Sequence, residues 1–290
     1  MRTAKNILPL SGKVAWITGA SSGIGEQLSY QFAARGAALI LSSRKRVSLE
    51  AVRSRAQEFK VEVRILPLDL ERLEELPKKA EEALAFFGRI DYMVHNAGVG
   101  LRDFALDTDL ATDQKIMNTN YFGPMVITKA VVPDMLRRKS GHLVVISSLS
   151  GKYGVPRTSS YAASKHAVQG FYETLRSEIA GSGVKITIIV PGIIQTRITA
   201  HALDGGGHLF GRVEQTFQSA YPVEKAAGKI LQAVLREKEE VFVGGTEGIT
   251  LIMNRISPWF LRRFIRNHPI KRLRNLKKKL FPGKRQYAET

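Results

Sequence analysis

The sequence contains no cysteine among its 290 residues. Disulfide bonds, thiolate metal sites and a cysteine nucleophile are therefore excluded. No stretch reaches the ~18 uninterrupted apolar residues of a membrane-spanning helix. Residues 1–10 also lack the apolar run of a secretory signal, so we expect a cytoplasmic protein.

Acidic residues are scarce, above all near the C-terminus. The chain carries 44 Lys and Arg against 26 Asp and Glu, a formal net charge of +18. From Arg255 onward there are twelve basic residues and one acidic residue, Glu289. The basic charge is therefore concentrated in a tail, which needs an explanation of its own.

Apolar, β-rich runs alternate with longer amphipathic segments before this tail. We expect strands at residues 14–18, 38–42, 61–66, 90–95, 142–147, 184–190 and 240–243. We expect helices at residues 25–35, 48–59, 73–87, 109–138, 161–180 and 223–236. This order predicts an α/β fold, a doubly wound and mostly parallel sheet of the Rossmann type. We predict a single such domain over residues 11–247, an N-terminal extension at 1–10 and a basic amphipathic extension at 248–290.

A glycine-rich turn follows the first predicted strand and opens the first helix. It reads Thr18-Gly19-Ala20-Ser21-Ser22-Gly23-Ile24-Gly25. Its glycines allow a tight turn and a close approach to a ligand. The helix N-terminus offers free N–H groups and partial positive charge to a pyrophosphate. A plain βα turn is the alternative, but the position after the first strand favours dinucleotide binding.

The end of the second strand indicates which dinucleotide binds. An acidic residue there would bond the 2′-hydroxyl of NAD, whereas a basic one accommodates the 2′-phosphate of NADP. Here Ser43 and Arg44 follow the strand, and the first acidic residue is Glu50. Ser43 can hydrogen-bond the phosphate, and Arg44 can pair with it. We therefore favour NADP(H) over NAD(H), although residues 44–46 could also form an ordinary solvated helix start.

Tyr161 and Lys165 lie four residues apart, so on a helix they share one face. A free tyrosine titrates near ~10, and a cation held beside it favours the phenolate. The pair is therefore a candidate proton-transfer device. The alternative is a core aromatic beside a solvated lysine, a spacing that chance often produces.

These motifs, in this order, resemble those of the short-chain dehydrogenase/reductase family over residues 10–245. Further matches are Asp69-Leu70, Asn96-Ala97-Gly98 and Pro191-Gly192, each after a predicted strand, while His95 stands where the family has a further Asn. The resemblance implies cofactor contacts at Gly19, Ser21, Ser22, Gly23, Ile24, Gly25, Ser43, Arg44, Asp69, Leu70, Asn96, Ala97, Gly98, Tyr161, Lys165, Pro191, Gly192, Ile194 and Thr196. Within the family, residues 120–124, 147–152 and 161–166 look most like the dehydrogenase/reductase member 7B group.

The same resemblance implies the catalytic residues. The family's catalytic serine lies thirteen positions before its catalytic tyrosine, which selects Ser148. The family's catalytic asparagine lies three positions before a small residue, which selects Asn120. Tyr161 would then give a proton to a carbonyl oxygen that Ser148 also binds. Lys165 would hold the nicotinamide ribose and lower the Tyr161 pKa, and Asn120 would order a water linking Lys165 to solvent. No metal site is predicted.

We therefore expect an NADP(H)-dependent oxidoreductase for a hydrophobic, lipid-like ketone or alcohol, with residues 202–210 as a flexible cover. A non-catalytic dinucleotide sensor or a membrane-surface interaction protein on the same fold is the alternative. The family also implies a homodimer or homotetramer.

The tail combines aromatic and basic residues. Ser257-Pro258 suits a helix start, and residues 249–285 mix apolar residues such as Trp259 and Leu276 with Arg and Lys. This pattern is typical of a helix on an anionic membrane surface. Packing on the protein or a second subunit, and a solvated extension, are the alternatives. No nucleic-acid partner is predicted, because no stacking platform accompanies the charge.

Overall fold

The computed structural model describes residues 8–212, 214, 217 and 220–266. Residues 8–248 belong to one compact unit and residues 249–266 to a second. The predicted apolar positions beyond 266, Leu276 among them, lie outside the described residues, as does most of the predicted extension at 1–10.

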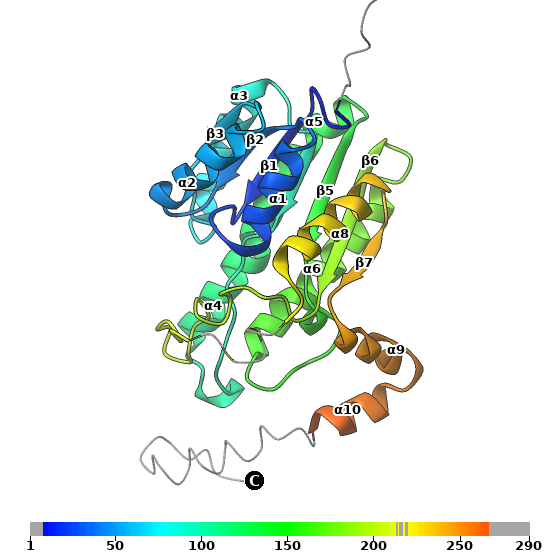
Figure 1. Ribbon diagram of the computed structural model, residues 1–290. Helices are drawn as coiled ribbons and strands as arrows, with labels where there is room; N and C mark the ends of the chain where they lie inside the picture. Colours follow the sequence, from blue (N-terminus) through cyan, green and yellow to red (C-terminus); the bar gives the residue numbers. More distant parts are fainter. Residues whose placement is uncertain (1–7, 213, 215–216, 218–219, 267–290) are drawn as a thin grey trace, which may run out of the picture. The chain divides into compact units, whose positions relative to one another are not determined.

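The first unit is built on a seven-stranded parallel sheet with the order β3-β2-β1-β4-β5-β6-β7 (Figure 1). Its strands are β1 (Val14–Thr18), β2 (Ala38–Ser42), β3 (Val63–Ile65), β4 (Tyr92–His95), β5 (Gly141–Ile146), β6 (Val184–Pro191) and β7 (Glu240–Val243). The predicted doubly wound α/β fold is confirmed, and every pairing in the sheet is parallel.

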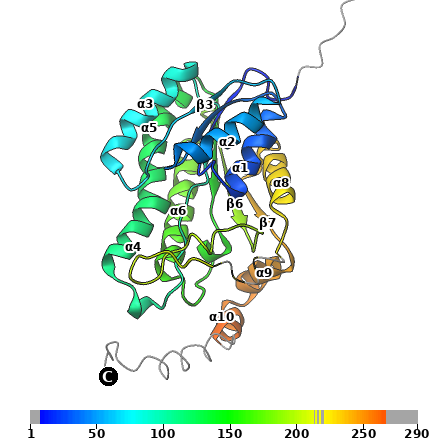
Figure 2. The same ribbon diagram turned by 60° about the vertical axis from the view of Figure 1, so that its left-hand side comes forward.

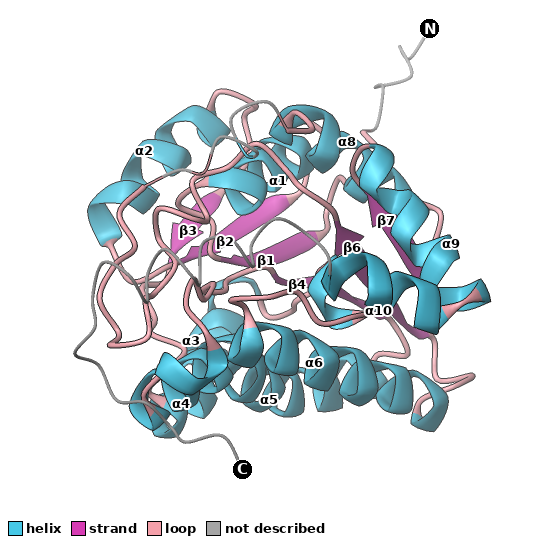
Figure 3. Ribbon diagram, turned by 90° about the horizontal axis from the view of Figure 1, so that it is seen from below, coloured by secondary structure: helices cyan, strands magenta, loops and turns pink. Residues whose placement is uncertain are grey.

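Helices cover both faces of the sheet (Figures 2 and 3). One face carries α1 (Gly23–Ala33), α2 (Arg46–Gln57) and α8 (Val223–Leu235). The other carries α3 (Leu76–Phe87), α4 (Leu110–Met117), α5 (Gly123–Arg137) and α6 (Ser159–Glu178). The β-branched and leucine side chains of the strands are therefore buried from both sides, which explains their unbroken apolar runs.

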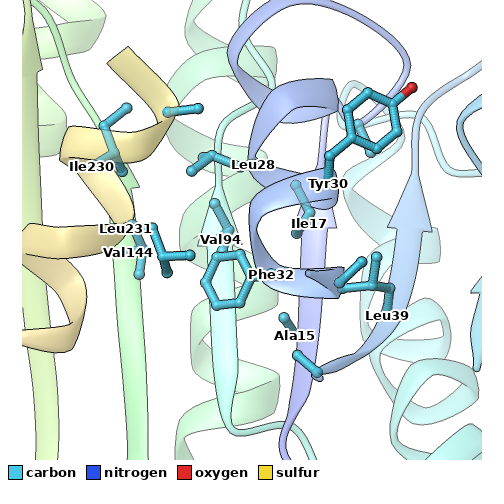
Figure 4. Close-up of a cluster of buried hydrophobic side chains, with 14 of the residues drawn as sticks. Ala15, Ile17, Leu28, Tyr30, Phe32, Leu39, Val94, Val144, Ile230 and Leu231 are labelled. Carbon is cyan, nitrogen blue, oxygen red and sulfur yellow. The ribbon is translucent and has the colours of Figure 1, made fainter. Parts of the chain in front are cut away.

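The core under α1 and α8 shows this packing directly (Figure 4). Ile17 of β1 and Val94 of β4 meet Leu28 and Phe32 of α1, all fully buried. Burying such side chains stabilises the fold by roughly 1.5–3 kcal/mol each. This core holds the carboxyl ends of β1 and β4 in fixed positions beside the start of α1.

The helix predicted over residues 109–138 is interrupted. A π-helical turn at Asn118–Phe122 separates α4 from α5. Such turns insert one residue into the i→i−4 ladder and occur frequently at functional sites. Hydrophobic periodicity could not show it, because the turn is fixed by contacts distant in sequence.

His95, at the end of β4, joins the sheet to α5 and α6. Its Nε2 atom lies 2.8 Å from Thr128 Oγ1, which lies 2.7 Å from the Tyr172 hydroxyl. Burial lowers the His95 pKa to about 3, so the ring is neutral. This residue, which departs from the family motif, therefore has a structural place in the core.

The second unit contains α9 (Ile249–Ile256) and α10 (Pro258–Arg266). Ser257 precedes α10, and its Oγ accepts a hydrogen bond of 3.4 Å from the Phe260 N–H. The predicted helix start at Ser257-Pro258 is therefore confirmed. No helix in the described part of the chain is long and apolar enough to cross a membrane.

Candidate active site

The site lies at the carboxyl ends of the strands, around β1 and β4. Strands β2 and β3 extend the sheet on one side of this pair, and β5, β6 and β7 on the other. The chain therefore reverses its winding between β1 and β4, and this is where doubly wound sheets form a ligand crevice. The glycine-rich turn follows β1 and Asn96-Ala97-Gly98 follows β4, while Asn120 lies in the π-helical turn and Tyr161 and Lys165 in α6.

The glycine-rich turn packs tightly against the chain that follows β4. Gly19 has φ +64, and a Cβ there would lie 2.8 Å from Ala97 Cα. A Cβ on Gly25 would lie 2.3 Å from Gly19 O, so neither position tolerates a side chain. Ser22 occupies the N-cap position of α1 without a side-chain capping hydrogen bond, and Ser21 precedes it. The turn therefore presents backbone N–H groups at a helix N-terminus, as an anion site requires.

Asn96 stabilises the glycine-rich turn through hydrogen bonds. Its Nδ2 donates to Thr18 O at 3.0 Å and to Gly19 O at 3.2 Å. The Asn96 and Ala97 N–H groups donate to Thr18 Oγ1 at 3.1 and 3.2 Å. The polar groups of Asn96 are thus turned toward the protein, which makes the residue a support for the predicted cofactor loop.

Basic residues gather beyond the end of β2. Arg44 is exposed, with its Nη1 3.8 Å from Glu71 Oε1, and Ser43 Oγ donates to Lys45 O at 3.5 Å. Burial lowers the pKa of His201, and the cations Arg197, Lys45 and Arg44 lower it further. A positive potential therefore exists at this end of the crevice.

The segment after β3 borders the same end. Asp69 Oδ1 accepts from the Glu71 N–H at 3.1 Å, and Leu70 is buried. A Cβ on Gly123, the first residue of α5, would lie 2.7 Å from Leu70 O. This close approach joins the predicted cofactor contacts at Asp69 and Leu70 to the start of α5, directly after the π-helical turn.

Tyr161 and Ser148 meet at the centre of the site. Ser148 follows β5 at the start of a short 3-10 turn, and Tyr161 lies in the first turn of α6. Ser148 lies close enough to the phenol to lower its pKa, and its hydroxyl accepts from the Ser150 N–H at 3.1 Å. Because the Ser148 oxygen is the acceptor in this bond, the hydroxyl hydrogen of Ser148 remains available to donate toward the phenol oxygen. Ser147 faces away, with its Oγ 3.5 Å from Lys165 O.

Lys165 lies one turn further along α6 with its ammonium buried. Its Nζ donates to Ile146 O at 2.8 Å and lies 5.9 Å from the centre of the Tyr161 ring. Burial lowers the Lys165 pKa to about 8. A Cβ on Gly98 would lie 3.6 Å from this Nζ, so the loop after β4 passes beside it.

The Tyr161 pKa differs from the sequence-based expectation. Burial raises the pKa of this phenol, and the Ser148 hydrogen bond and the Arg102 charge lower it by less. The Lys165 ammonium donates to the Ile146 carbonyl. Burial therefore outweighs the lowering expected from the sequence, and the phenol is a protonated group at neutral pH.

Asn120 lies in the π-helical turn and is almost fully buried. Its Nδ2 donates to Val99 O at 2.9 Å and Ser164 Oγ at 3.0 Å, and its Oδ1 accepts from the Val99 N–H at 2.8 Å. These contacts fix the loop after β4 against α6. Asn120 is predicted to order a water. In the structure its side chain makes three hydrogen bonds within the protein, and these position the loop after β4.

The chain after β6 closes the other side of the crevice. A Cβ on Gly23 would lie 3.3 Å from Thr196 Cγ2, so this segment faces the glycine-rich turn. Ile194 is buried and bridges to Tyr221. Pro191 ends β6 and Gly192 follows it, with its N–H donating to Val243 O at 2.9 Å. The glycine-rich turn and the segment after β6, which both carry predicted cofactor residues, therefore lie side by side.

Glu247 is a residue of this wall that sequence reasoning missed. Its Oε1 accepts from the Ile193 N–H at 2.8 Å and the Gly245 N–H at 3.0 Å. The same oxygen would lie 2.0 Å from a Cβ on Gly192, so the glycine leaves room for the carboxylate. No local motif marks a lone Glu some fifty residues away, and only folding brings it to the Pro191-Gly192 segment.

The segment predicted as a cover folds back over the loop after β4. Leu203 N donates to Gly100 O at 2.9 Å, and Arg102 N donates to Leu203 O at 2.8 Å. Leu203 packs with Leu101 and Ile116, and Tyr161 packs against this group. The covering segment therefore brings apolar side chains to the phenol. Among the described residues, no three His, Asp or Glu gather as metal ligands.

Comparison with known proteins agrees with this geometry. The short chain dehydrogenase family model matches residues 13–205. A "Dehydrogenase/reductase SDR family protein 7-like" of Anopheles gambiae is 40% identical over 248 residues, 84% of this chain and 78% of its own. A "Dehydrogenase/reductase SDR family member 7B" of Xenopus tropicalis is 35% identical over 242 residues, 81% of this chain and 78% of its own. The predicted likeness to the 7B group is therefore confirmed.

Two solved structures are also similar. A short chain dehydrogenase/reductase from Burkholderia phymatum in complex with NAD has a TM-score of 0.75 at 23% identity, covering 85% of this chain and 93% of its own. A metagenomic short-chain oxidoreductase in complex with NADP has a TM-score of 0.67 at 27% identity, covering 81% and 97%. Both nicotinamide dinucleotides thus occur on this fold.

Proposed function

The chain belongs to the short-chain dehydrogenase family and is an oxidoreductase acting on CH–OH or C=O groups, and we propose that it uses NADP(H) to interconvert a hydrophobic, lipid-like ketone and its alcohol. The observation that carries the proposal is the convergence of Tyr161, Ser148 and Lys165 beside the glycine-rich turn. A bare backbone turn at a helix N-terminus, with glycines that admit no side chain, fits a dinucleotide pyrophosphate. Bound NADPH supplies the hydride.

The side chains of the site supply the proton and the positioning. Tyr161, protonated at neutral pH, gives its hydroxyl proton to the substrate oxygen as negative charge develops there. Ser148 donates a hydrogen bond to the same oxygen and stabilises that charge. Lys165 provides a buried cation next to the phenol, which stabilises the phenolate that remains. Asn120 keeps the neighbouring loop in place through Val99.

The preference for NADP(H) is supported by the cations around Arg44. A 2′-phosphate would meet Arg44, which Glu71 pairs only at 3.8 Å, and the charges of Lys45 and Arg197 act in the same region. We expect Arg44→Gln to lower kcat/KM for NADPH about tenfold or more, the value of a charge-assisted hydrogen bond, with little change for NADH. Initial rates with both cofactors measure this. An equal loss with both would contradict the assignment of Arg44 to the phosphate.

Glu247 is proposed to position the wall that holds the nicotinamide. Glu247→Ala removes the acceptor of two backbone N–H groups, so we expect the Kd for NADPH to rise about tenfold. Glu247→Gln keeps an acceptor oxygen and is expected to restore most of the affinity, and Glu224→Gln, exposed on α8, serves as the control. Fluorescence titration of NADPH measures all three. Wild-type affinity in Glu247→Ala would remove this role.

The test of the proposed function is NADPH oxidation against a panel of apolar ketones. The proposed enzyme turns over at least one of them and forms the matching alcohol. A protein that binds NADPH but oxidises it with none of them would instead be the dinucleotide sensor. Light scattering on the same sample tests the proposed homodimer or homotetramer.

The second unit favours one further function, attachment to an anionic membrane surface. Trp259, Phe260 and Phe264 of α10 are more than half exposed, and Arg262 and Arg263 lie among them. Exposed aromatics beside cations suit the headgroup region, and such attachment would make the protein a peripheral one. The full chain is expected to sediment with phosphatidylserine vesicles at low salt and less at high salt, while residues 1–248 alone stay in solution. Equal sedimentation of both would contradict the assignment.

A further inference from the structure

A largely buried arginine, Arg102, lies close enough to Tyr161 for its charge to lower the pKa of the phenol. Arg102 is held through its backbone N–H, which donates to Leu203 O at 2.8 Å. Its neighbour Leu101 is fully buried in the apolar group against which Tyr161 packs. The side chain of Arg102 is 16% exposed. Arg102 belongs to none of the matched family motifs and has no part in the proposed proton transfer.

The guanidinium of Arg102 is already bound to a carboxylate. Its Nε lies 3.2 Å from Glu214 Oε2, and its Nη1 donates to Leu101 O at 3.0 Å. The Glu214 N–H donates to Thr199 Oγ1 at 3.2 Å, so the acid comes from the segment that covers the site. The Arg102 guanidinium therefore has the chemistry to hold a carboxylate, and in this structure it holds the carboxylate of Glu214.

The surroundings of this ion pair are aromatic and basic. Arg102 lies 5.8 Å from the centre of the Phe217 ring. Arg157 donates from Nη2 to Arg102 O at 3.0 Å and lies 5.9 Å from the ring centres of Phe104 and Phe210. Arginine over aromatic rings suits a ligand that is apolar along its length and anionic at one point.

The nearest other acid is engaged elsewhere. Asp103 accepts from the Phe104 N–H at 2.9 Å and the Gly205 N–H at 3.1 Å. Its carboxylate is therefore used to shape the loop, and Glu214 is the acid paired with Arg102. Displacing Glu214 would leave a buried cation, which is costly unless another anion replaces it.

We propose that Arg102 binds a carboxylate of the substrate, and that the Glu214 carboxylate occupies this position until the substrate displaces it. The substrates are therefore hydrophobic oxo acids and the matching hydroxy acids. This inference rests on the proposed function. The carboxylate is unchanged in the reaction: hydride from NADPH forms the new C–H bond, and the Tyr161 proton goes to the former carbonyl oxygen. The guanidinium holds the distant end of the molecule and orients the ketone.

The test compares each acid with its own methyl ester. The probes are oxododecanoic acids with the ketone at successive carbons, their methyl esters, and dodecanones as neutral ketones. For the wild type, kcat/KM for the best acid is expected to exceed that for its ester at least about tenfold, because the charge-assisted hydrogen bond is lost in the ester. Glu214→Gln is expected to raise this ratio further, since it removes the competing charge.

Arg102 variants separate substrate binding from a structural role. Arg102→Gln is expected to bring the acid-to-ester ratio to about one, Arg102→Lys to restore part of it, and Arg236→Gln, an exposed residue after α8, to leave it unchanged. If Arg102 and Glu214 only brace the covering segment, their variants change acid and ester by the same factor, and the inference is overturned. Reduction of esters and dodecanones without preference for acids also overturns it, while leaving the proposed function intact. No NADPH oxidation with any probe would remove both.

Discussion

Replacing Tyr161 with Phe is expected to lower kcat at least about 100-fold, the range typical for loss of a general acid. The variant keeps the aromatic ring that packs against Leu101 and Leu203 but lacks the hydroxyl that Ser148 meets. The fold and the cofactor crevice are therefore retained, and only the proton is missing. Steady-state reduction of an apolar ketone measures the loss, and fluorescence titration is expected to show NADPH binding within about threefold of wild type.

Tyr172→Phe is the matched control for that variant. Tyr172 is also buried on α6, but its hydroxyl meets Thr128 in the core. Removing it is expected to cost about 1 kcal/mol of stability, the value of one hydrogen bond, with kcat nearly unchanged. If Tyr161→Phe and Tyr172→Phe lost turnover equally, a proton-donor role for Tyr161 would be contradicted.

A second large effect is expected from the buried cation. The Lys165 pKa is lowered to about 8 by burial, so the ammonium is present below this pH and is lost above it. The phenol of Tyr161 has a raised pKa, so Lys165 is the first of the two to lose its proton. We expect kcat/KM for NADPH, which reports the free enzyme, to fall about tenfold per pH unit above pH 8.

Lys165→Met removes this titration. The side chain keeps its length without charge, so the hydrogen bond to Ile146 O and the cation near the phenol are both lost. We expect kcat/KM at pH 7 to fall by about 100-fold or more, and the break near pH 8 to disappear from the remaining activity. A wild-type profile that stays flat to pH 10 would exclude Lys165 as the essential cation.

The layout of the sheet was accessible from the sequence. Strands β1, β2 and β7 have the predicted bounds, because continuous apolar runs between turn residues leave little choice of end point. The grouping of Tyr161, Ser148 and Lys165 followed from spacing and family resemblance. Parallel strands deliver their carboxyl ends to one edge, so residues after each strand converge there.

Three features depend on contacts that no local pattern encodes. The π-helical turn follows from the hydrogen bonds between Asn120 and Val99, which lie in separate segments. Glu247 follows β7, and the pairing of β7 with β6 brings it to the Ile193 N–H. The raised pKa of Tyr161 results from burial, a property of the packed site, whereas the sequence showed only a nearby lysine.

Transfer of deuterium from NADPH labelled at the reactive C4 position tests the central claim most directly. Wild-type protein and Tyr161→Phe are incubated with the labelled cofactor and an apolar ketone, and the alcohol is analysed by mass spectrometry. The proposed mechanism predicts one deuterium on the carbinol carbon of the wild-type product, and at least about 100-fold less labelled alcohol from Tyr161→Phe. Labelled alcohol from both proteins in equal amounts, or from neither while NADPH is bound, would contradict it.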